Sequence, residues 1–352
     1  MDITKLTTFI NESFLSSLLV DKEITDISYN GKNIFYLHNL KGRKKADISI
    51  DEMTAKDFIR QIANLSEKQF SFQNPKLDVS VGKYRINAVH PSIGRLNNQP
   101  CLTFSIRIAS SELLITDSSS FLNAALICLF EVLLQSNMSI VVGGITGSGK
   151  TEFQKYLISK LDEMTRIIII DNVLELDCLA IEKDLDINIW QSDEKNSEMC
   201  MQELVKNALR SNPDWLLVAE SRGKEMVEVL NSAMTGHPII TTIHAMNVTS
   251  MPTRIARMVM MNEQKQDFET LMQDIYYHFR FYVFLKRNID KKGIVHRFIE
   301  EVSYVKENGE KHTIYQRNNK GYTTSFIDQE TLALLNYEEN ENFKKFYVEE
   351  KA

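Results

Sequence analysis

The chain has 352 residues, of which 43% are hydrophobic and 25% are charged. These proportions are typical of globular proteins, and they exclude a disordered or fibrous chain. The length exceeds that of a usual single-core domain, so we expect two domains, one of them large enough for a complete α/β sheet.

The net charge is −6 at pH 7, so the chain has no overall positive field with which to bind a nucleic-acid backbone. Its cysteines form no CxxC pair, so the sequence indicates neither a disulfide framework nor a zinc site. They are Cys101, Cys128, Cys178 and Cys200. The N-terminus lacks the pattern of a signal peptide. The most apolar stretch, residues 121–134, is shorter than the ~20 residues that span a bilayer, so we expect a core helix there and a chain that stays inside the cell.

Two hairpins are predicted in the first hundred residues. Apolar residues alternate on both sides of Asn30-Gly31, a dipeptide that favours the positive φ angles of a tight turn. A second pair of alternating segments flanks Gly82-Lys83, and helical spacing of apolar residues between the hairpins predicts a helix. These features, with a further strand over residues 101–108 and a serine-rich linker, predict an α+β domain over residues 1–112.

Beyond residue 113 the pattern changes to buried strands that alternate with helices, which is typical of a parallel sheet with right-handed crossovers. The expected strands are residues 138–142, 166–171, 215–220 and 238–244. One helix between them has an apolar face made of Met226, Val229, Leu230, Ala233 and Met234.

The strands after residue 279 are expected to form an antiparallel β appendage, which completes a domain over residues 113–330. Residues 331–352 are expected to be an acidic, solvated tail.

The most specific motif follows the first buried strand. Residues 144–151 read GITGSGKT, the GxxxxGK[ST] pattern, and a helix is expected after them. The glycines let backbone N–H groups converge on phosphates, Lys150 reaches the outer phosphates, and the Thr151 hydroxyl can ligate Mg²⁺. We therefore predict a site for ATP and Mg²⁺ made of Gly144, Ile145, Thr146, Gly147, Ser148, Gly149, Lys150 and Thr151.

Polar side chains follow the carboxyl ends of three other expected strands, where ligands bind in open α/β sheets. Glu220 ends an apolar strand and is the candidate for positioning the attacking water. Asp171 and Glu175 follow a second strand and His244 follows a third. For the two acids, helix capping or simple surface exposure is the alternative, and for His244 it is a hydrogen-bonded core imidazole.

With these residues in order, the chain resembles the type II and type IV secretion ATPase family, and most of all its VirB11-like and Tad-pilus (CpaF-like) branches. The similarity runs over residues 15–305, and its most specific segments are LRSNPD, before Glu220, and TGHPIITTIHA, which contains His244. The resemblance implies a RecA-like P-loop NTPase domain with a parallel-sheet core, preceded by a smaller α+β, PAS-like N-terminal domain.

The resemblance also implies ATP hydrolysis and a role for each candidate residue. These are the Walker A pair Lys150 and Thr151, the Walker B acid Glu220, the Asp-box acids Asp171 and Glu175, the phosphate-sensing His244, and Arg85 and Arg107, which reach the nucleotide from the N-terminal domain. It implies a homohexameric ring in the cytoplasm, at the inner face of the cell membrane. The partner would be an inner-membrane platform or coupling protein.

Two motifs depart from the family pattern, and the family arginine expected after residues 187–190, which read INIW, is missing. Asp171-Asn172 stands where Glu-Asp is usual, and Ala219-Glu220-Ser221 stands where Gly-Glu and an apolar residue are usual. A nucleotide-gated scaffold with weak hydrolysis is therefore an alternative to a motor for secretion, conjugation or pilus assembly. A nucleic-acid translocase is a further alternative, which the net charge disfavours. The basic cluster of the chain is expected to be a solvated hairpin, and it consists of Lys286, Arg287, Lys291, Lys292 and Arg297.

Overall fold

The computed structural model describes residues 2–110, 112–176, 184–194, 196–262 and 267–349. Cys178 and the last residues of the expected tail lie outside these ranges. The chain divides into two compact units. The N-terminal unit contains the chain up to Glu112 together with residues 173–176 and Asn288–His296, and the C-terminal unit contains the other described residues.

The N-terminal unit is built on a six-stranded sheet with the order β3-β2-β1-β8-β5-β4. Its strands are β1 (Ile24–Tyr29), β2 (Ile34–His38), β3 (Gly42–Lys45), β4 (Lys76–Val81), β5 (Tyr84–Val89) and β8 (Thr103–Ile108), and a small separate ladder joins β6 (Arg95–Leu96) to β7 (Gln99–Pro100). All neighbouring strands are antiparallel. Both predicted hairpins are present, as β1-β2 and β4-β5, and Gly31 has the expected positive φ of 94°.

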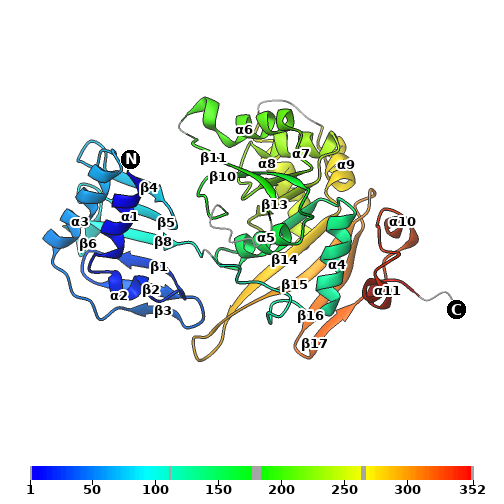
Figure 1. The fold of residues 1–352 in the computed structure, drawn as a ribbon, viewed down its shortest axis with the longest axis horizontal. Coiled ribbons are helices and arrows are strands. Elements are labelled where there is room, and N and C mark those ends of the chain that lie inside the picture. The colour runs from blue at the N-terminus through cyan, green and yellow to red at the C-terminus, as the bar shows by residue number, and fades with distance from the viewer. Residues whose placement is uncertain (1, 111, 177–183, 195, 263–266, 350–352) are drawn as a thin grey trace. The chain divides into compact units, whose positions relative to one another are not determined.

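The helices of the N-terminal unit are α1 (Ile3–Asn11), α2 (Ser16–Leu19) and α3 (Glu52–Leu65) (Figure 1). The carboxylate of Asp51 caps α3 by accepting a hydrogen bond from the backbone N–H of Thr54 at 2.7 Å. Phe58, Ile59 and Ile62 on one side of α3 are buried in a core shared with the sheet. This unit therefore has a hydrophobic core of its own.

The C-terminal unit contains a nine-stranded sheet with the order β11-β10-β12-β13-β9-β14-β15-β16-β17. The strands are β9 (Ile140–Gly144), β10 (Arg166–Asp171), β11 (Asp186–Gln191), β12 (Trp215–Val218), β13 (Ile239–Ile243), β14 (Phe281–Ile289), β15 (Val295–Val305), β16 (Lys311–Asn318) and β17 (Gly321–Thr324). The neighbours from β11 to β14 are parallel. The four strands predicted from buried apolar runs are all in this parallel part.

Helices lie on both faces of this sheet (Figure 1). They are α4 (Ala124–Gln135), α5 (Lys150–Ser159), α6 (Met201–Ala208), α7 (Met226–Met234), α8 (Met251–Val259), α9 (Phe268–His278), α10 (Gln329–Leu332) and α11 (Glu341–Tyr347), with short 3-10 turns η1 (Ser197–Met199), η2 (Leu209–Ser211) and η3 (Val248–Ser250). Among the described helices, none has the length and hydropathy required to cross a membrane.

Two predicted helices are present, with differences in detail. The core helix is α4, and Asn123 caps it by accepting a hydrogen bond from the N–H of Leu126 at 3.1 Å. The apolar face predicted for α7 is buried except for Met234, which is 46% exposed because it lies in the last turn.

The predicted antiparallel appendage is wrong for its first strand. β14 lies parallel to β9 inside the main sheet, with Val283 aligned with Val142 and Leu285 with Gly144. Five consecutive buried residues from Phe281 give β14 the apolar run of a central strand, which accounts for its position. The later strands extend the same sheet, and β16 is antiparallel to both of its neighbours, β15 and β17.

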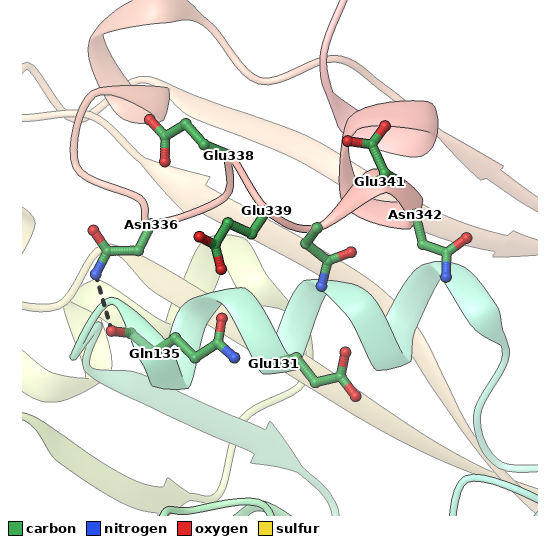
Figure 2. Close-up of a pocket in the computed structure, with 8 residues that line it drawn as sticks. Glu131, Gln135, Asn336, Glu338, Glu339, Glu341 and Asn342 are labelled. Carbon is green, nitrogen blue, oxygen red and sulfur yellow. Dashed lines mark hydrogen bonds between the residues drawn. The ribbon is translucent and has the colours of Figure 1, made fainter.

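The prediction that the C-terminal segment is solvated is wrong for part of the segment. Phe343 and Tyr347 in α11 are fully buried, and the Tyr347 hydroxyl donates a hydrogen bond to the Ala125 carbonyl in α4 at 3.0 Å. Between this segment and α4 lies an open, acidic groove of about 720 Å³, lined by residues such as Glu131, and Figure 2 shows its carboxylates and amides. Two aromatic residues therefore anchor a segment whose charge alone indicated exposure.

Candidate nucleotide site

The phosphate loop joins β9 to α5 in the C-terminal unit. Gly149 caps α5 with a left-handed φ of 97°, which favours glycine. Position 144 requires glycine because neighbouring atoms leave no room for a side chain. A Cβ atom there would lie 2.5 Å from Ser148 Oγ and 2.6 Å from the Leu285 carbonyl oxygen. The motif glycines therefore meet both needs of a phosphate cradle, a left-handed turn and room for the backbone.

Lys150 and Ser148 show that the interior of this loop fits a phosphate group. Lys150 is 9% exposed, and its Nζ donates to the carbonyls of Gly144 at 3.1 Å and Ile145 at 3.4 Å. Ser148 is fully buried, and its hydroxyl has no hydrogen-bond partner among the described residues. A buried cation and an unpaired hydroxyl inside a glycine loop can both be satisfied by phosphate oxygens.

The register of the parallel strands brings the other polar strand ends to the same edge of the sheet. Val218 of β12 is aligned with Thr241 of β13 and with Ile170 of β10, and Ile243 of β13 is aligned with Gly143 of β9. Glu220, His244 and Asp171 follow or end these strands, so they lie along the edge that carries the phosphate loop. Asp171 is 2% exposed there.

Glu220 lies at the centre of a charged group on this edge. Its Oε1 atom lies 2.7 Å from Nε2 of His244, and its other carboxylate oxygen forms an ion pair with Arg222. Burial acts to raise the pKa of Glu220, but the hydrogen bond and charge of Arg222, the charge that His244 carries in the acid range where a carboxyl titrates, and the charge of Lys150 outweigh burial and lower the pKa below its ordinary value. The carboxylate is therefore ionised at neutral pH.

His244 is neutral at neutral pH by the same reasoning. Burial lowers its pKa first, the Lys150 charge lowers it further, and the Glu220 carboxylate opposes both without reversing them. The pair at the edge thus consists of a carboxylate that can accept a proton and a neutral imidazole that can donate or accept a hydrogen bond.

Ser221, one of the departures from the family pattern, is explained by its surroundings. It is 1% exposed, and its hydroxyl lies 2.9 Å from the Thr241 hydroxyl on the neighbouring strand. Thr242 donates to the Ala219 carbonyl at 2.8 Å. One hydroxyl pair and one hydroxyl-to-carbonyl hydrogen bond therefore join the segment that follows β12 to β13, next to Glu220 in the chain.

Arg85, Arg107 and Glu175 belong to the N-terminal unit, whereas the other candidate residues belong to the C-terminal unit. Arg107 Nη1 lies 3.0 Å from Glu175 Oε1, and Arg85 Nη2 lies 3.7 Å from Asp78 Oδ2. The nucleotide-binding role of the two arginines, and of Glu175, stays a prediction.

Comparison with known proteins assigns the chain to a family. Residues 79–276, more than half of the chain, match the family described as type II/IV secretion system protein. The chain belongs to this secretion family. The predicted family is thereby confirmed.

Curated relatives of the secretion family align with most of the chain. An uncharacterized protein of Bacillus anthracis is 30% identical over 287 residues, which cover 80% of this chain and 63% of that protein. The type IV secretion system protein VirB11 of Bartonella quintana is 29% identical over 244 residues, which cover 68% of this chain and 65% of that protein. The chain thus spans less than two thirds of the length of these two relatives.

A solved structure confirms the predicted fold class. The X-ray structure of the Legionella pneumophila ATPase DotB matches with a TM-score of 0.60 at 19% identity, covering 84% of this chain and 80% of that one. At this identity the likeness concerns the fold alone, a RecA-like α/β domain preceded by a smaller N-terminal domain.

Three arginines of this secretion-family chain were missed as site residues by sequence reasoning. Arg222 stands two residues after Glu220, and that proximity was the available signal. The expectation of a solvated basic hairpin is wrong for two of its members: Arg297 donates to the Gly147 carbonyl at 2.7 Å, and the Nε atom of Arg287 is buried. Arg287 lies against the phosphate loop because β14 is a neighbour of β9, and Arg297 reaches the loop from β15, the next strand in the sheet.

Proposed function

We propose that the chain is an ATP-hydrolysing motor subunit of a secretion, conjugation or pilus machine. The observation that carries the proposal is the Glu220–His244 pair, 2.7 Å apart, on the edge that bears the phosphate loop with its buried Lys150. An ionised carboxylate beside a phosphate cradle can orient a water for attack on a terminal phosphate, and the neutral imidazole can form a hydrogen bond to that phosphate.

The residues of the loop bind and orient the phosphates. Lys150 exchanges its loop carbonyls for phosphate oxygens, and Ser148 and the loop N–H groups complete the cradle. Bound Mg²⁺ would neutralise charge on the phosphates, and the Thr151 hydroxyl in the first turn of α5 would hold it. Mg²⁺ in such sites takes the rest of its ligands from water and from the phosphates of the nucleotide.

Glu220 orients the attacking water and takes its proton. His244 contacts the terminal phosphate, so the presence of that phosphate affects β13, which His244 follows. The ion pair with Arg222 and the contact with His244 hold Glu220 before substrate arrives. Asp171, at the end of the neighbouring strand, adds negative charge near the metal and phosphates. When nucleotide binds, Glu220 leaves Arg222 and His244 and contacts the attacking water instead, and this change starts hydrolysis.

Arg85, Arg107 and Glu175 couple the N-terminal unit to the nucleotide. The guanidinium groups stabilise charge on the transferred phosphoryl group, and Arg107 leaves Glu175, its partner at 3.0 Å, to do so. We propose a homohexameric ring in which this exchange moves the N-terminal domains. The domains are proposed to span residues 1–112 and 113–330, with residues 331–352 as a C-terminal segment.

The ring is proposed to act in the cytoplasm at the inner face of the cell membrane, on a platform or coupling protein. This rests on the family and on relatives such as the type IV secretion system protein VirB11 of Bartonella quintana. The net charge of −6 disfavours nucleic acid as a direct ligand.

A nucleotide-gated scaffold with weak hydrolysis is the second candidate. The observation that favours it is the double engagement of Glu220 by Arg222 and His244, which keeps the carboxylate from water. A scaffold requires Lys150 for binding but hardly requires Glu220.

Phosphate release separates the two candidates. The rate is measured with Mg²⁺ over a protein-concentration series, with molecular size measured alongside, for the wild type, Glu220→Gln and Lys150→Ala. A motor gives turnover that rises with ring formation and is lost in both variants. Equal, slow release by the wild type and Glu220→Gln would establish the scaffold instead.

A further inference from the structure

Two arginines face the phosphate loop from the side opposite to Glu220 and His244. In the sheet, β9 leads into the loop, with β13 and β12 on one side and β14 and β15 on the other. Leu285 of β14 is aligned with Gly144, the last residue of β9. Arg287 therefore lies just past the end of β9, beside the loop.

The contacts of the two arginines involve the tip of the loop. Arg297 on β15 donates from Nε to the Gly147 carbonyl at 2.7 Å, and its Cδ lies 3.7 Å from the position that a Cβ atom would take at Gly149. The Nη1 atom of Arg287 lies 3.6 Å from the corresponding position at Gly147. The Arg287 guanidinium thus lies against Gly147, and the aliphatic part of the Arg297 side chain lies against Gly149.

Arg287 and the adjacent Lys286 differ in the partners of their charged groups. Its Nε atom is buried and has no hydrogen-bond partner among the described residues. Lys286, whose side chain points to the other face of β14, forms an ion pair with Glu300. A buried cationic donor without an acceptor favours an anion that supplies one.

The direction of a bound nucleotide follows from the order of the strands. Its terminal phosphate must lie toward Glu220 and His244, which follow β12 and β13. A polyphosphate chain held by a loop after β9 therefore runs from that side toward β14 and β15. The end nearest Arg287 is the α-phosphate, which carries the nucleoside.

We propose that Arg287 binds the α-phosphate end of the nucleotide and that Arg297 is a positioning residue, which holds the loop through the Gly147 carbonyl. The inference rests on the proposed function, because it takes the loop to bind a nucleoside di- or triphosphate. Since the α-phosphate is present in both ATP and ADP, Arg287 acts on both nucleotides equally. A group that acts on the terminal phosphate instead discriminates between them.

The test is titration calorimetry of the full chain with Mg²⁺, using ADP and a non-hydrolysable ATP analogue. Arg287→Ala is expected to weaken both nucleotides by the same factor, about tenfold or more, with partial recovery in Arg287→Lys. Lys286→Ala, which removes the same charge from the adjacent residue, is the matched control and is expected to stay within about twofold.

Three results would overturn the role of Arg287. The first is an unchanged ADP affinity in Arg287→Ala, and the second is a loss of affinity confined to the ATP analogue. The third is an equal loss of affinity in Lys286→Ala, which would indicate a general electrostatic effect of surface charge. If the wild type binds neither nucleotide, the proposed function fails together with the inference. If the wild type binds both and Arg287→Ala binds them equally well, the inference alone fails.

Arg297 is tested by steady-state kinetics and thermal unfolding. Arg297→Ala is expected to raise the KM for ATP about tenfold with a smaller change in kcat, and Arg297→Lys, which can still donate to the Gly147 carbonyl, is expected to restore much of it. A lowered unfolding midpoint with an unchanged KM would overturn the positioning role.

Discussion

The carboxylate of Glu220 lies 2.7 Å from Nε2 of His244, although the two residues follow different strands. They meet because β12 and β13 are parallel neighbours, with Val218 aligned with Thr241. The pair lies on the edge of the sheet that carries the phosphate loop, so its chemistry is directed at whatever the loop binds.

Replacement of the Glu220 carboxylate separates binding from hydrolysis. Glu220→Gln keeps the size of the side chain but cannot take a proton, so we expect kcat to fall by about 10²-fold or more while ADP affinity stays within about threefold. The measurement combines single-turnover phosphate release with nucleotide titration. A variant that hydrolyses ATP at the wild-type rate would remove Glu220 from the mechanism.

The titration of His244 has a defined direction. Its pKa is lowered from 6.5, so the imidazole is expected to gain its proton only at a pH below that value. Glu220 opposes the shift, so Glu220→Gln should lower the midpoint further, whereas Lys150→Ala should raise it. NMR of the imidazole ring in the nucleotide-free protein gives all three midpoints. Opposite displacements would show that these charges do not act on His244.

The same shift contributes to stability with a defined sign. Because the folded pKa lies below the unfolded value of 6.5, the unfolded chain binds more protons as the pH falls through 6.5. The contribution of His244 is therefore present above that pH and lost below it. Denaturation at pH 5.5 and 7.5, with His244→Gln as control, is expected to show a smaller pH dependence in the variant.

Gly144 is expected to tolerate no side chain. A Cβ atom there would lie 2.6 Å from the Leu285 carbonyl oxygen, so Gly144→Ala must displace β14 or the loop. We expect loss of nucleotide affinity by at least about tenfold, together with lower stability. Gly236→Ala is the control, because Gly236 also has a positive φ, 91°, but has no atom within 4 Å of its Cβ position. Equal effects on nucleotide affinity would refute the steric argument.

The anchoring of the C-terminal segment can be measured by chemical denaturation. Phe343 is fully buried, so Phe343→Ala should lower the free energy of unfolding by about 3–5 kcal/mol if the segment unfolds with the rest of its unit. Lys345→Ala in the same helix is exposed and should change it by less than about 0.5 kcal/mol. A loss below about 1 kcal/mol for Phe343→Ala would indicate that the segment detaches before global unfolding.

The sequence predicted the hairpins, the parallel strands and the phosphate loop because each has a local pattern. It missed β11, in which only partly buried and exposed residues alternate, so no apolar run marks it. It placed the C-terminal segment in solvent because acidic residues outnumber the two aromatic anchors there. It also treated Arg287 and Arg297 as solvated, since a charge pattern cannot reveal which strand lies beside the loop.

The sequence by itself predicted the conformation of the loop, because a phosphate cradle is made by consecutive backbone groups whose conformation depends on neighbouring glycines. It also determined which polar residues stand at strand ends. Only the tertiary structure decided which of them meet. β9 lies between β13 and β14 in the sheet, so strands far apart in the chain bring Glu220 and His244 to one side of the loop and Arg287 and Arg297 to the other. Arg297 and Gly147 are 150 residues apart, and hydrogen bonding across that separation depends on strand order, which no local pattern encodes.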